Sequence, residues 1–490
     1  MSSEQQQKTL NGGNESQIDA QCHQPTEKQP DPYPYFLFLS SKHIATLLFA
    51  LFVVWAFPWL YAGVSWKPLD KVRRSEIWVL NCDVVPNASS LNPALAPYLA
   101  AAFPHPVGSS WLQSSVLNRS SSISAVNHFV SFTCPNVPSN SSLPCGSAEE
   151  ELACVEYIDH LMKDDQKGWG LIYFASNFTT TIMSYIYGSG ISPHGQTVEM
   201  QYHYVSGRDY PAIRFGSSVL MEGVFPSISQ GIMASLATLA NSFAVDPLLF
   251  ARGIQVMRGD QSPVRFFGQH FASFFFCVNI WLGSTFLAGL NYNFKTPAEA
   301  AYLDIKTVNK PGKKQLLKEL LFKLAFSLLF LFVLAVLLVC IIWSLGRGKA
   351  PFHRNGGQAM ALLWFLGWGF LGINWVLVSV MGAEKFSSIA AFILVLQLTT
   401  GNAIFHNILS TNFFKMGRMF PFYYATRGLR TIFFGVMENK WWVNWLVIAA
   451  WNVGTLLMAV PIAVHITVKK SEEMALRFAG KKVPPQLAIL

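Results

Sequence analysis

The chain has 490 residues, of which 51% are hydrophobic and 13% are charged, and its mean hydropathy is +0.32. A soluble domain carries about 25% charged residues, so this composition excludes a wholly soluble protein. The net charge of +9 comes from 36 Lys and Arg against 27 Asp and Glu. Because the chain also holds 39 Phe and 15 Trp, many of them in long uncharged runs, we expect the lipid bilayer and not nucleic acid as its partner.

The N-terminal part combines a polar tail with a first membrane span. Residues 1–40 are rich in Gln, Asn, Ser, Glu and Pro, which predicts a disordered cytosolic tail. Residues 45–66 carry no charge, and a helix of that length, rising about 1.5 Å per residue, crosses a hydrocarbon core of about 30 Å. A cleaved signal peptide is the alternative, but a long polar segment precedes this run. We therefore expect transmembrane helix 1 at 45–66.

Residues 67–265 are mixed in character and predict an α+β extracytoplasmic domain. Partial alternation of apolar and polar residues predicts strands at 77–85, 125–132, 170–175 and 197–204. Helices are expected at 177–187 and 218–244. The apolar run 228–239 is an alternative seventh span, but it is too short before Asn241 and Ser242, and an odd number of spans would place a lysine-rich loop outside.

Sequons and cysteines in this domain indicate an oxidising compartment. Four Asn-x-Ser/Thr sequons predict glycosylation on the extracytoplasmic side, at Asn87, Asn118, Asn140 and Asn177. Four of the seven cysteines lie in the same segment and predict two disulfides, in one of three pairings that the sequence leaves open: Cys82, Cys134, Cys145 and Cys154. Metal binding by these cysteines is disfavoured because they show no Cys-x-x-Cys spacing.

Five apolar runs follow and predict a five-helix membrane domain over 266–468. The spans are expected at 266–290, 320–345, 358–381, 386–409 and 441–468. Residues 469–490 contain five Lys or Arg and predict a basic cytosolic tail. The predicted fold class is therefore a polytopic α-helical membrane protein with six transmembrane helices, one before and five after the α+β domain.

The charge distribution supports this topology. Residues 67–265 carry 12 Lys and Arg against 15 Asp and Glu, a net of −3, which leaves 24 against 12, a net of +12, for the rest of the chain. The positive-inside rule then places both termini in the cytosol. Two loops disagree, because 346–354 and 410–440 would lie outside and yet hold eight Lys or Arg.

The order of segments and several local patterns resemble a known family. The patterns are Val79–Asp83, Gly168–Ile172, Asn177–Thr179, Pro421–Tyr424 and Arg427–Gly435. Over about residues 40–470 the chain resembles the fungal nitrosoguanidine-resistance membrane proteins, which are distantly similar to ABC type-2 permeases and to the bacterial phage-infection-protein group. The resemblance implies resistance to toxic compounds, with transport or lipid organisation at the plasma membrane, and it supplies no catalytic or ligand residues.

The loop before the last span is rich in arginine and aromatic residues. Arg418, Arg427 and Arg430 among Phe, Tyr and Met predict a short interfacial helix whose guanidinium groups bind lipid headgroups. The alternative is that these arginines pair with the acidic ectodomain or cap helices, and we weigh it slightly higher.

Polar residues inside spans are the candidates for a substrate path, because burying them in lipid is unfavourable. We select Gln397, Asn402, His406, Asn374 and His270. Such residues often only link helices by hydrogen bonds, and for any one of them this simpler role is the more frequent. Span five holds the densest polar group, so a path through the bundle is expected along it.

The sequence contains no nucleotide-binding loop, no H-E-x-x-H and no G-x-S-x-G, so we expect neither an enzyme nor a cofactor or metal. His194, Glu199 and His203 are the only polar set that invites an ectodomain enzyme, and a surface role explains them better. If transport uses ATP, a separate ATPase or another membrane subunit must supply it.

Two functions remain. The first is a permease-like protein of the plasma membrane, or of an internal membrane, that exports toxic compounds or alters lipid organisation. The second is a non-transporting scaffold or regulator that acts through its ectodomain. The oligomeric state does not follow from the sequence.

Overall fold

The computed structural model of the chain describes residues 76–84, 129–135, 145–187, 198–218, 254–265, 267–304, 310–345, 352–401 and 412–478, with isolated positions between 221 and 237. Some predictions lie outside these residues: the tail 1–40, the span 45–66, the end of the chain from 479, and the residues Asn87, Asn118, Asn140, His194, Asn402 and His406.

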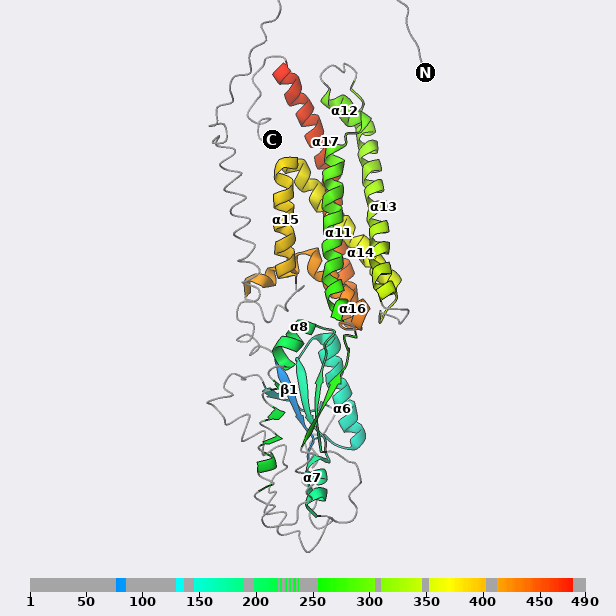
Figure 1. The fold of residues 1–490 in the computed structure, drawn as a ribbon. Coiled ribbons are helices and arrows are strands. Elements are labelled where there is room, and N and C mark those ends of the chain that lie inside the picture. Colours follow the sequence, from blue (N-terminus) through cyan, green and yellow to red (C-terminus); the bar gives the residue numbers. More distant parts are fainter. Residues whose placement is uncertain are drawn as a thin grey trace, which may run out of the picture. The chain divides into compact units, whose positions relative to one another are not determined.

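A five-stranded sheet forms the centre of the segment that precedes the apolar helices, in the order β2-β1-β3-β4-β5 (Figure 1). The strands are β1 (Ile77–Asn81), β2 (Phe129–Ser131), β3 (Gly170–Phe174), β4 (Glu199–Tyr204) and β5 (Gln255–Asp260). Neighbours run parallel except β3 and β4, which are antiparallel with Leu171 opposite His203. All of β3 and four of the five residues of β1 are buried, as in strands covered on both faces.

The predicted strands correspond to β1 to β4, and β5 is the strand that sequence reasoning missed. β5 lies at the edge of the sheet, and none of its six residues is fully buried. An edge strand with little burial needs no regular alternation of apolar residues, so the pattern that reveals the other strands is weak here.

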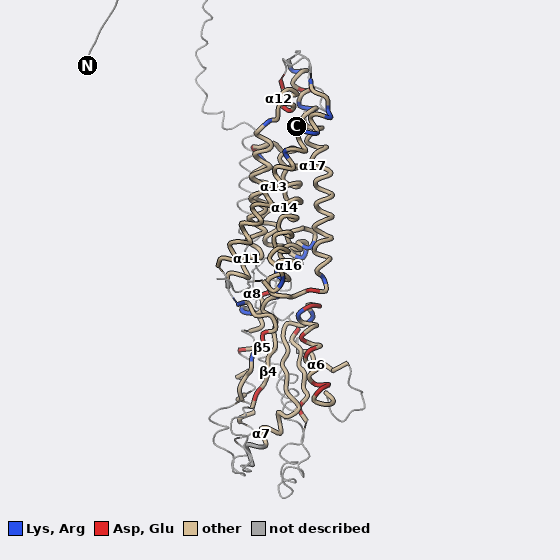
Figure 2. Tube along the Cα trace, turned by 90° about the vertical axis from the view of Figure 1, so that its right-hand side faces the viewer, with Lys and Arg blue, Asp and Glu red and all other residues tan. Residues whose placement is uncertain are grey.

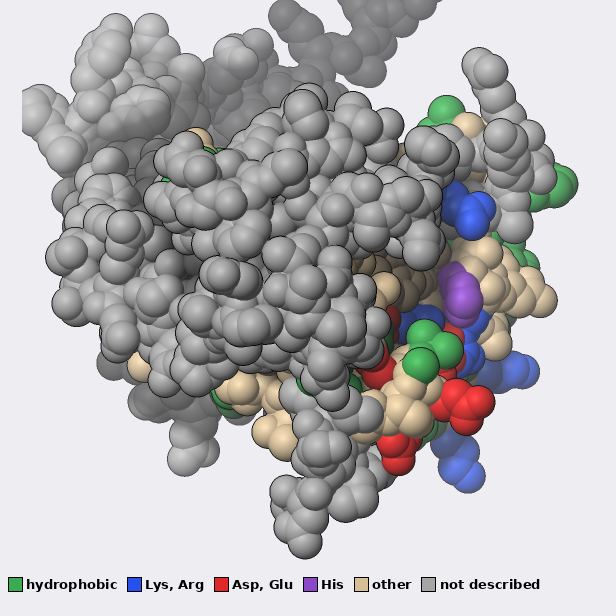
Figure 3. Space-filling model, turned by 90° about the horizontal axis from the view of Figure 1, so that it is seen from below, with side chains coloured by type: hydrophobic (Ala, Val, Ile, Leu, Met, Phe, Trp, Pro, Cys, Tyr) green, Lys and Arg blue, Asp and Glu red, His purple; other side chains and the backbone are tan. Residues whose placement is uncertain are grey.

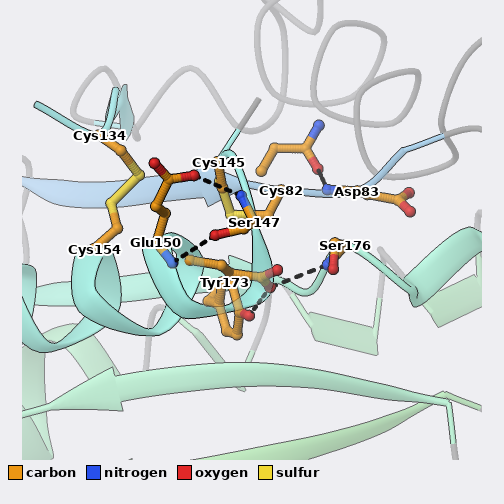
Figure 4. Close-up of a disulfide and its surroundings, with 11 residues drawn as sticks. Cys82, Asp83, Cys134, Cys145, Ser147, Glu150, Cys154, Tyr173 and Ser176 are labelled. Carbon is orange, nitrogen blue, oxygen red and sulfur yellow. Dashed lines mark hydrogen bonds between the residues drawn. A yellow bond between two sulfur atoms is a disulfide. The ribbon is translucent and has the colours of Figure 1, made fainter. Parts of the chain in front are cut away.

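Helix α6 (Ala148–His160) lies beside the sheet and continues into a π turn at Leu161–Asp165 (Figure 1). The helix begins at a capping box, in which Ser147 Oγ accepts from Glu150 N at 3.3 Å and Glu150 Oε2 accepts from Ser147 N at 2.7 Å (Figure 4). Three successive glutamates in its first turn interrupt the apolar periodicity, which is why the sequence analysis did not predict it.

Two disulfides tie α6 to the sheet and select one of the three pairings left open. Cys82, just after β1, bonds Cys145 before α6, and Cys134, just after β2, bonds Cys154 within α6 (Figure 4). All four cysteines are buried. Because β1 and β2 are neighbours in the sheet, both bridges hold α6 against the same end of these strands.

Helix α7 (Phe178–Tyr187) brings two of the family-like patterns together. Asp83, just after β1, accepts from Thr179 N at 2.8 Å and from Thr179 Oγ1 at 2.6 Å, and both residues are fully buried. Asp83 therefore stabilises the first turn of α7, as an acidic group does at a helix N-terminus. Asn177, the one predicted sequon asparagine among the described residues, is exposed beside this contact.

Five described helices are long and apolar enough to cross a membrane. They are α11 (Phe267–Asn293), α13 (Lys313–Leu345), α14 (Gly356–Met381), α15 (Ala383–Thr400) and α17 (Trp441–Phe478). Figure 2 shows Lys and Arg at the ends of these helices, while their middle parts are almost free of charge. The spans predicted from 266 onward thus correspond to apolar helices, and the shorter α12 (Pro297–Leu303) and α16 (Pro421–Phe434) connect them.

The central helix α14 packs closely against α17 through small residues. A Cβ at Gly372 would lie 2.5 Å from Thr455 Oγ1, and one at Gly369 would lie 2.7 Å from Asn452 Oδ1. Glycines of this kind let membrane helices approach at backbone distance. In contrast, α13 exposes large apolar side chains such as Phe322 and Trp343, as expected of a helix that faces lipid.

Two boundaries differ from the prediction. Helix α13 begins at Lys313 and not at residue 320, so the basic residues before the apolar run already belong to the helix. Helix α17 continues to Phe478, so the first residues of the predicted basic tail belong to the same helix as the last apolar run. Both extensions carry Lys and Glu, residues with high helix propensity that a hydrophobicity pattern does not register.

Candidate functional site

The candidate site lies where the sheet domain contacts the helices, and α16 carries it. Pro421 occupies the start of this helix, and Gly435 ends it in the left-handed conformation with φ 65°. Twelve of its fourteen residues are buried. Helix α16 packs against α11, α14 and α17, and the small Gly428 permits close contact with Leu362. Headgroup binding by its arginines stays a prediction.

A buried ion pair joins α16 to the sheet domain. Arg430 is 1% exposed and Asp209 is fully buried, and Arg430 Nη1 lies 3.5 Å from Asp209 Oδ2. The same nitrogen donates to the carbonyl of Arg208 at 3.1 Å. Asp209 Oδ1 accepts from Ala212 N at 3.0 Å and thereby caps the short helix α8 (Tyr210–Ala212). Arg430 thus pairs with the sheet domain, as in the alternative to headgroup binding.

Arg208 is the second buried arginine of this site. Its Nη1 and Nη2 donate to the carbonyls of Gly168 and Gln166, both at 2.6 Å, and its guanidinium carbon lies 4.2 Å from the centre of the Trp169 ring. Burial lowers the pKa of Arg208 to about 9, and the neighbouring Asp209 partly opposes that change. Burial likewise raises the pKa of Asp209, while Arg430 acts in the opposite direction.

Arg427 is the third arginine of this site, and it lines the same small cavity as Arg208 and Arg430. Its Nε and Nη2 atoms are buried and have no hydrogen-bond partner among the described residues. A small cavity of about 10 Å³ is lined by all three arginines together with Gly401, Tyr423 and Thr426. This volume accommodates one water or one monatomic ion. We call Arg208, Arg427, Arg430 and Asp209 the arginine cluster, which contains three cations and one carboxylate.

A second set of contacts joins the π turn of α6 to the segment after α16. Met437 N donates to the carbonyl of Lys163 at 3.0 Å, and Glu438 N donates to Asp164 Oδ1 at 3.0 Å. Met437 adopts φ 61°, a left-handed conformation that is unusual for a residue with a side chain. The junction is therefore held by backbone hydrogen bonds as well as by the buried ion pair.

Contacts at the junction account for part of the positive charge in the two loops that disagreed with the positive-inside rule. Glu438 Oε1 lies 3.3 Å from Arg354 Nε and 3.5 Å from His353 Nε2, while Arg430 pairs with Asp209. Arg418 is exposed. Because Arg354 and Arg430 meet carboxylates at the junction, these two charges serve protein contacts and are a poor guide to the side of the membrane.

A larger cavity of about 310 Å³ lies at the same junction. Its described lining combines three basic side chains with three phenylalanines: Lys163, Arg265, His353, Phe352, Phe433 and Phe434. We call it the aromatic cavity. Polar side chains from the segment after β5 and from the first turn of α11 complete its wall.

The residues predicted to line a substrate path lie in different parts of the structure. His270 is buried at the start of α11, 6.0 Å from the Tyr210 ring, so it belongs to the junction and not to the middle of a span. Asn374 Nδ2 donates to Ser284 Oγ at 2.9 Å and links α14 to α11, which is the simpler structural role. Gln397 is fully buried in α15, and neither polar atom of its side chain has a partner among the described residues.

The polar set proposed for an ectodomain enzyme has a structural explanation. His203 Nδ1 lies 3.2 Å from Asp159 Oδ2, and its Nε2 lies 3.1 Å from Gln201 Oε1, so His203 links β4 to α6. Within the described part of the chain, no group of three His, Cys, Asp or Glu side chains is placed to hold a metal ion. Seen from below, the described side chains show Asp and Glu next to Lys and Arg (Figure 3).

Sequence reasoning missed Arg208, Asp209 and Trp169. One local signal was available: Asp209 precedes Tyr210 and Pro211, and an aspartate followed by proline within two residues is typical of a helix start. Nothing local indicates that Asp209 also meets Arg430, because that contact depends on how the sheet domain and α16 come together.

Long apolar helices, joined to a mixed sheet domain through buried arginines, define a helical membrane protein with an α/β domain. The sequence profile of DUF3533, described as a protein of unknown function, matches residues 45–457. The chain belongs to this family. Neither the comparison with curated proteins nor the comparison with solved structures gives a match.

Proposed function

We propose that the chain is a permease-like membrane protein that moves an amphipathic compound, a toxic substance or a lipid, and thereby contributes to resistance. In this proposal the sheet domain lies outside the plasma membrane and both termini lie in the cytosol. The similarity to ABC type-2 permeases and to nitrosoguanidine-resistance proteins is part of the same proposal. Energy would come from a separate ATPase or another membrane subunit, since the sequence has no nucleotide-binding loop.

The observation that carries the proposal is the position of Gln397. Its side chain is fully buried in α15, with both polar atoms unpartnered among the described residues. An unsatisfied amide is unfavourable in an apolar bundle, so a retained one is a candidate for function. One helical turn further, Gly401 lines the small cavity of the arginine cluster. Gln397 thus lies one helical turn from a cavity that is lined by cations at the junction.

Reconstitution tests this proposal. The full chain in vesicles should move labelled lipid or labelled toxic compound, and Gln397→Leu should abolish the movement because it removes the polar group. The matched control is Asn279→Leu, since Asn279 is exposed on α11 and its amide only bonds the carbonyl of Phe275 at 2.9 Å. Equal movement by both variants, together with full resistance in cells, would contradict the proposal.

The close attachment of the sheet domain to α16 favours the alternative, a scaffold or regulator that acts through its ectodomain. The buried pair Asp209–Arg430 and the hydrogen bonds at Met437 and Glu438 would transmit binding of a partner to the helices. Replacing residues 67–265 by an unrelated domain separates the two functions. A scaffold loses activity on replacement and keeps it in Gln397→Leu, whereas a permease needs Gln397.

A further inference from the structure

The aromatic cavity is formed by five separate parts of the chain. Lys163 comes from the π turn after α6, Arg265 from the segment between β5 and α11, and His353 from the segment before α14. The first turn of α11 and the last turn of α16 complete it. Its volume of about 310 Å³ is at the lower end of the range for small-molecule sites.

The charge of the cavity is positive. Lys163, Arg265 and His353 line it, and its described lining includes no Asp or Glu. Among these three residues, His353 has an acidic partner outside the lining: Glu438 Oε1 lies 3.5 Å from His353 Nε2 and 3.3 Å from Arg354 Nε. The N-terminus of α11, a helix of 27 residues, adds the positive end of its dipole.

The floor of the cavity is apolar and held in place. Phe433 and Phe434 are 4% and 6% exposed, and the Phe433 ring lies 5.5 Å from the Phe352 ring and 6.4 Å from Phe276. A Cβ at Gly207 would lie 2.5 Å from Phe434 Cβ, so the sheet domain fixes Phe434 from the other side. A rigid aromatic surface next to cations binds a ligand that has both an apolar body and a negative charge.

The position of the cavity, next to the start of the apolar part of α11, indicates where such a ligand comes from. The membrane-crossing part of α11 begins at Gly268, next to the cavity residues Arg265 and Gln269. Basic side chains at the end of a span lie at the level of lipid headgroups. A purely inorganic anion would leave the phenylalanine floor unused, and a cationic amphiphile would be repelled.

We propose that the aromatic cavity binds the anionic head and the first apolar carbons of an amphiphile, either an anionic phospholipid or a free organic acid with an alkyl chain. This inference rests on the proposed function, because it names the chemical class of the transported compound. Binding can nevertheless be measured without movement, so loss of transport with retained binding overturns only the proposed function.

The test uses the full chain in phosphatidylcholine nanodiscs and two probes. The first is dansyl-undecanoate, a free anionic amphiphile, and the second is phosphatidylglycerol added to the nanodisc and counted by native mass spectrometry. The double variant Lys163→Gln, Arg265→Gln should weaken binding at least tenfold. The matched control is Arg258→Gln on β5, which is half exposed and outside the cavity, and it should change affinity less than twofold.

The outcomes are distinct. Loss of both probes in the double variant supports the site for either source, while loss of one probe alone identifies that source. Equal binding by the double variant and the control overturns the inference. Equal affinity for the uncharged dansyl-undecanol also overturns it, because binding would then need no anionic head. Competition by inorganic phosphate at the same concentration as undecanoate overturns it as well, because binding would then need no apolar body.

Discussion

Asp209 stabilises two elements with the two oxygens of one carboxylate. Oδ1 caps α8 and Oδ2 faces Arg430, so this single residue connects the sheet domain with α16. Both partners are buried, and removing one member of a buried pair costs about 3–5 kcal/mol because the other charge is left without compensation. The junction between the sheet domain and α16 therefore depends strongly on the side chain of one residue.

We therefore predict that Asp209→Asn lowers the apparent unfolding temperature of the detergent-solubilised chain, measured by size-exclusion chromatography after heating. Glu222→Gln is the control, since Glu222 is half exposed and its nearest cation, Arg258, is 4.0 Å away. In the double variant with Arg430→Gln, the combined loss should fall short of the sum by about 0.5–3 kcal/mol. A purely additive result would show that the two side chains do not interact.

At the scale of elements, α6 is held to the sheet by covalent bonds as well as by packing. The two disulfides attach it to the ends of β1 and β2 (Figure 4). Glu151 within it accepts hydrogen bonds from the hydroxyl of Tyr173 and from Ser176 N. Glu151 is buried, and burial together with this carboxylate raises the pKa of Tyr173. The π turn after α6 contacts the segment after α16, so the position of α6 affects the junction.

The two disulfides should contribute unequally. They close loops with sequence separations of 63 and 20 residues, and loop-closure entropy assigns about 4 kcal/mol to the longer loop and about 3 kcal/mol to the shorter. We expect the pair Cys82→Ser, Cys145→Ser to increase protease cleavage of the sheet domain more than the pair Cys134→Ser, Cys154→Ser. The reverse order would mean that the chain-entropy account does not apply to this domain.

At the scale of the whole molecule, the arrangement predicts a sided membrane protein. Two labelling variants test it in cells: Arg258→Cys on β5 and Lys313→Cys at the start of α13, both exposed residues. A membrane-impermeant maleimide should label Arg258→Cys on intact cells and Lys313→Cys only after permeabilisation, with the unmodified chain as the background. The opposite pattern would reverse the proposed topology.

Several features could be deduced from the sequence alone because their signals are local. The long apolar helices follow from uninterrupted hydrophobic runs, and strands β1 to β4 and helix α7 follow from short periodic patterns. The presence of two disulfides follows from four cysteines in one polar segment. Each of these depends on the composition or periodicity of one continuous segment of the chain.

Other features required the folded structure because they join residues far apart in the sequence. The cysteine pairing, the burial of α16, the contact of Arg430 with a residue 222 positions away, and the aromatic cavity all belong to this group. The residues next to an arginine in the sequence do not show whether its side chain is buried in the protein or binds a lipid headgroup. What distinguishes them is whether a carboxylate from another part of the chain reaches the guanidinium, and for Arg430 Asp209 does.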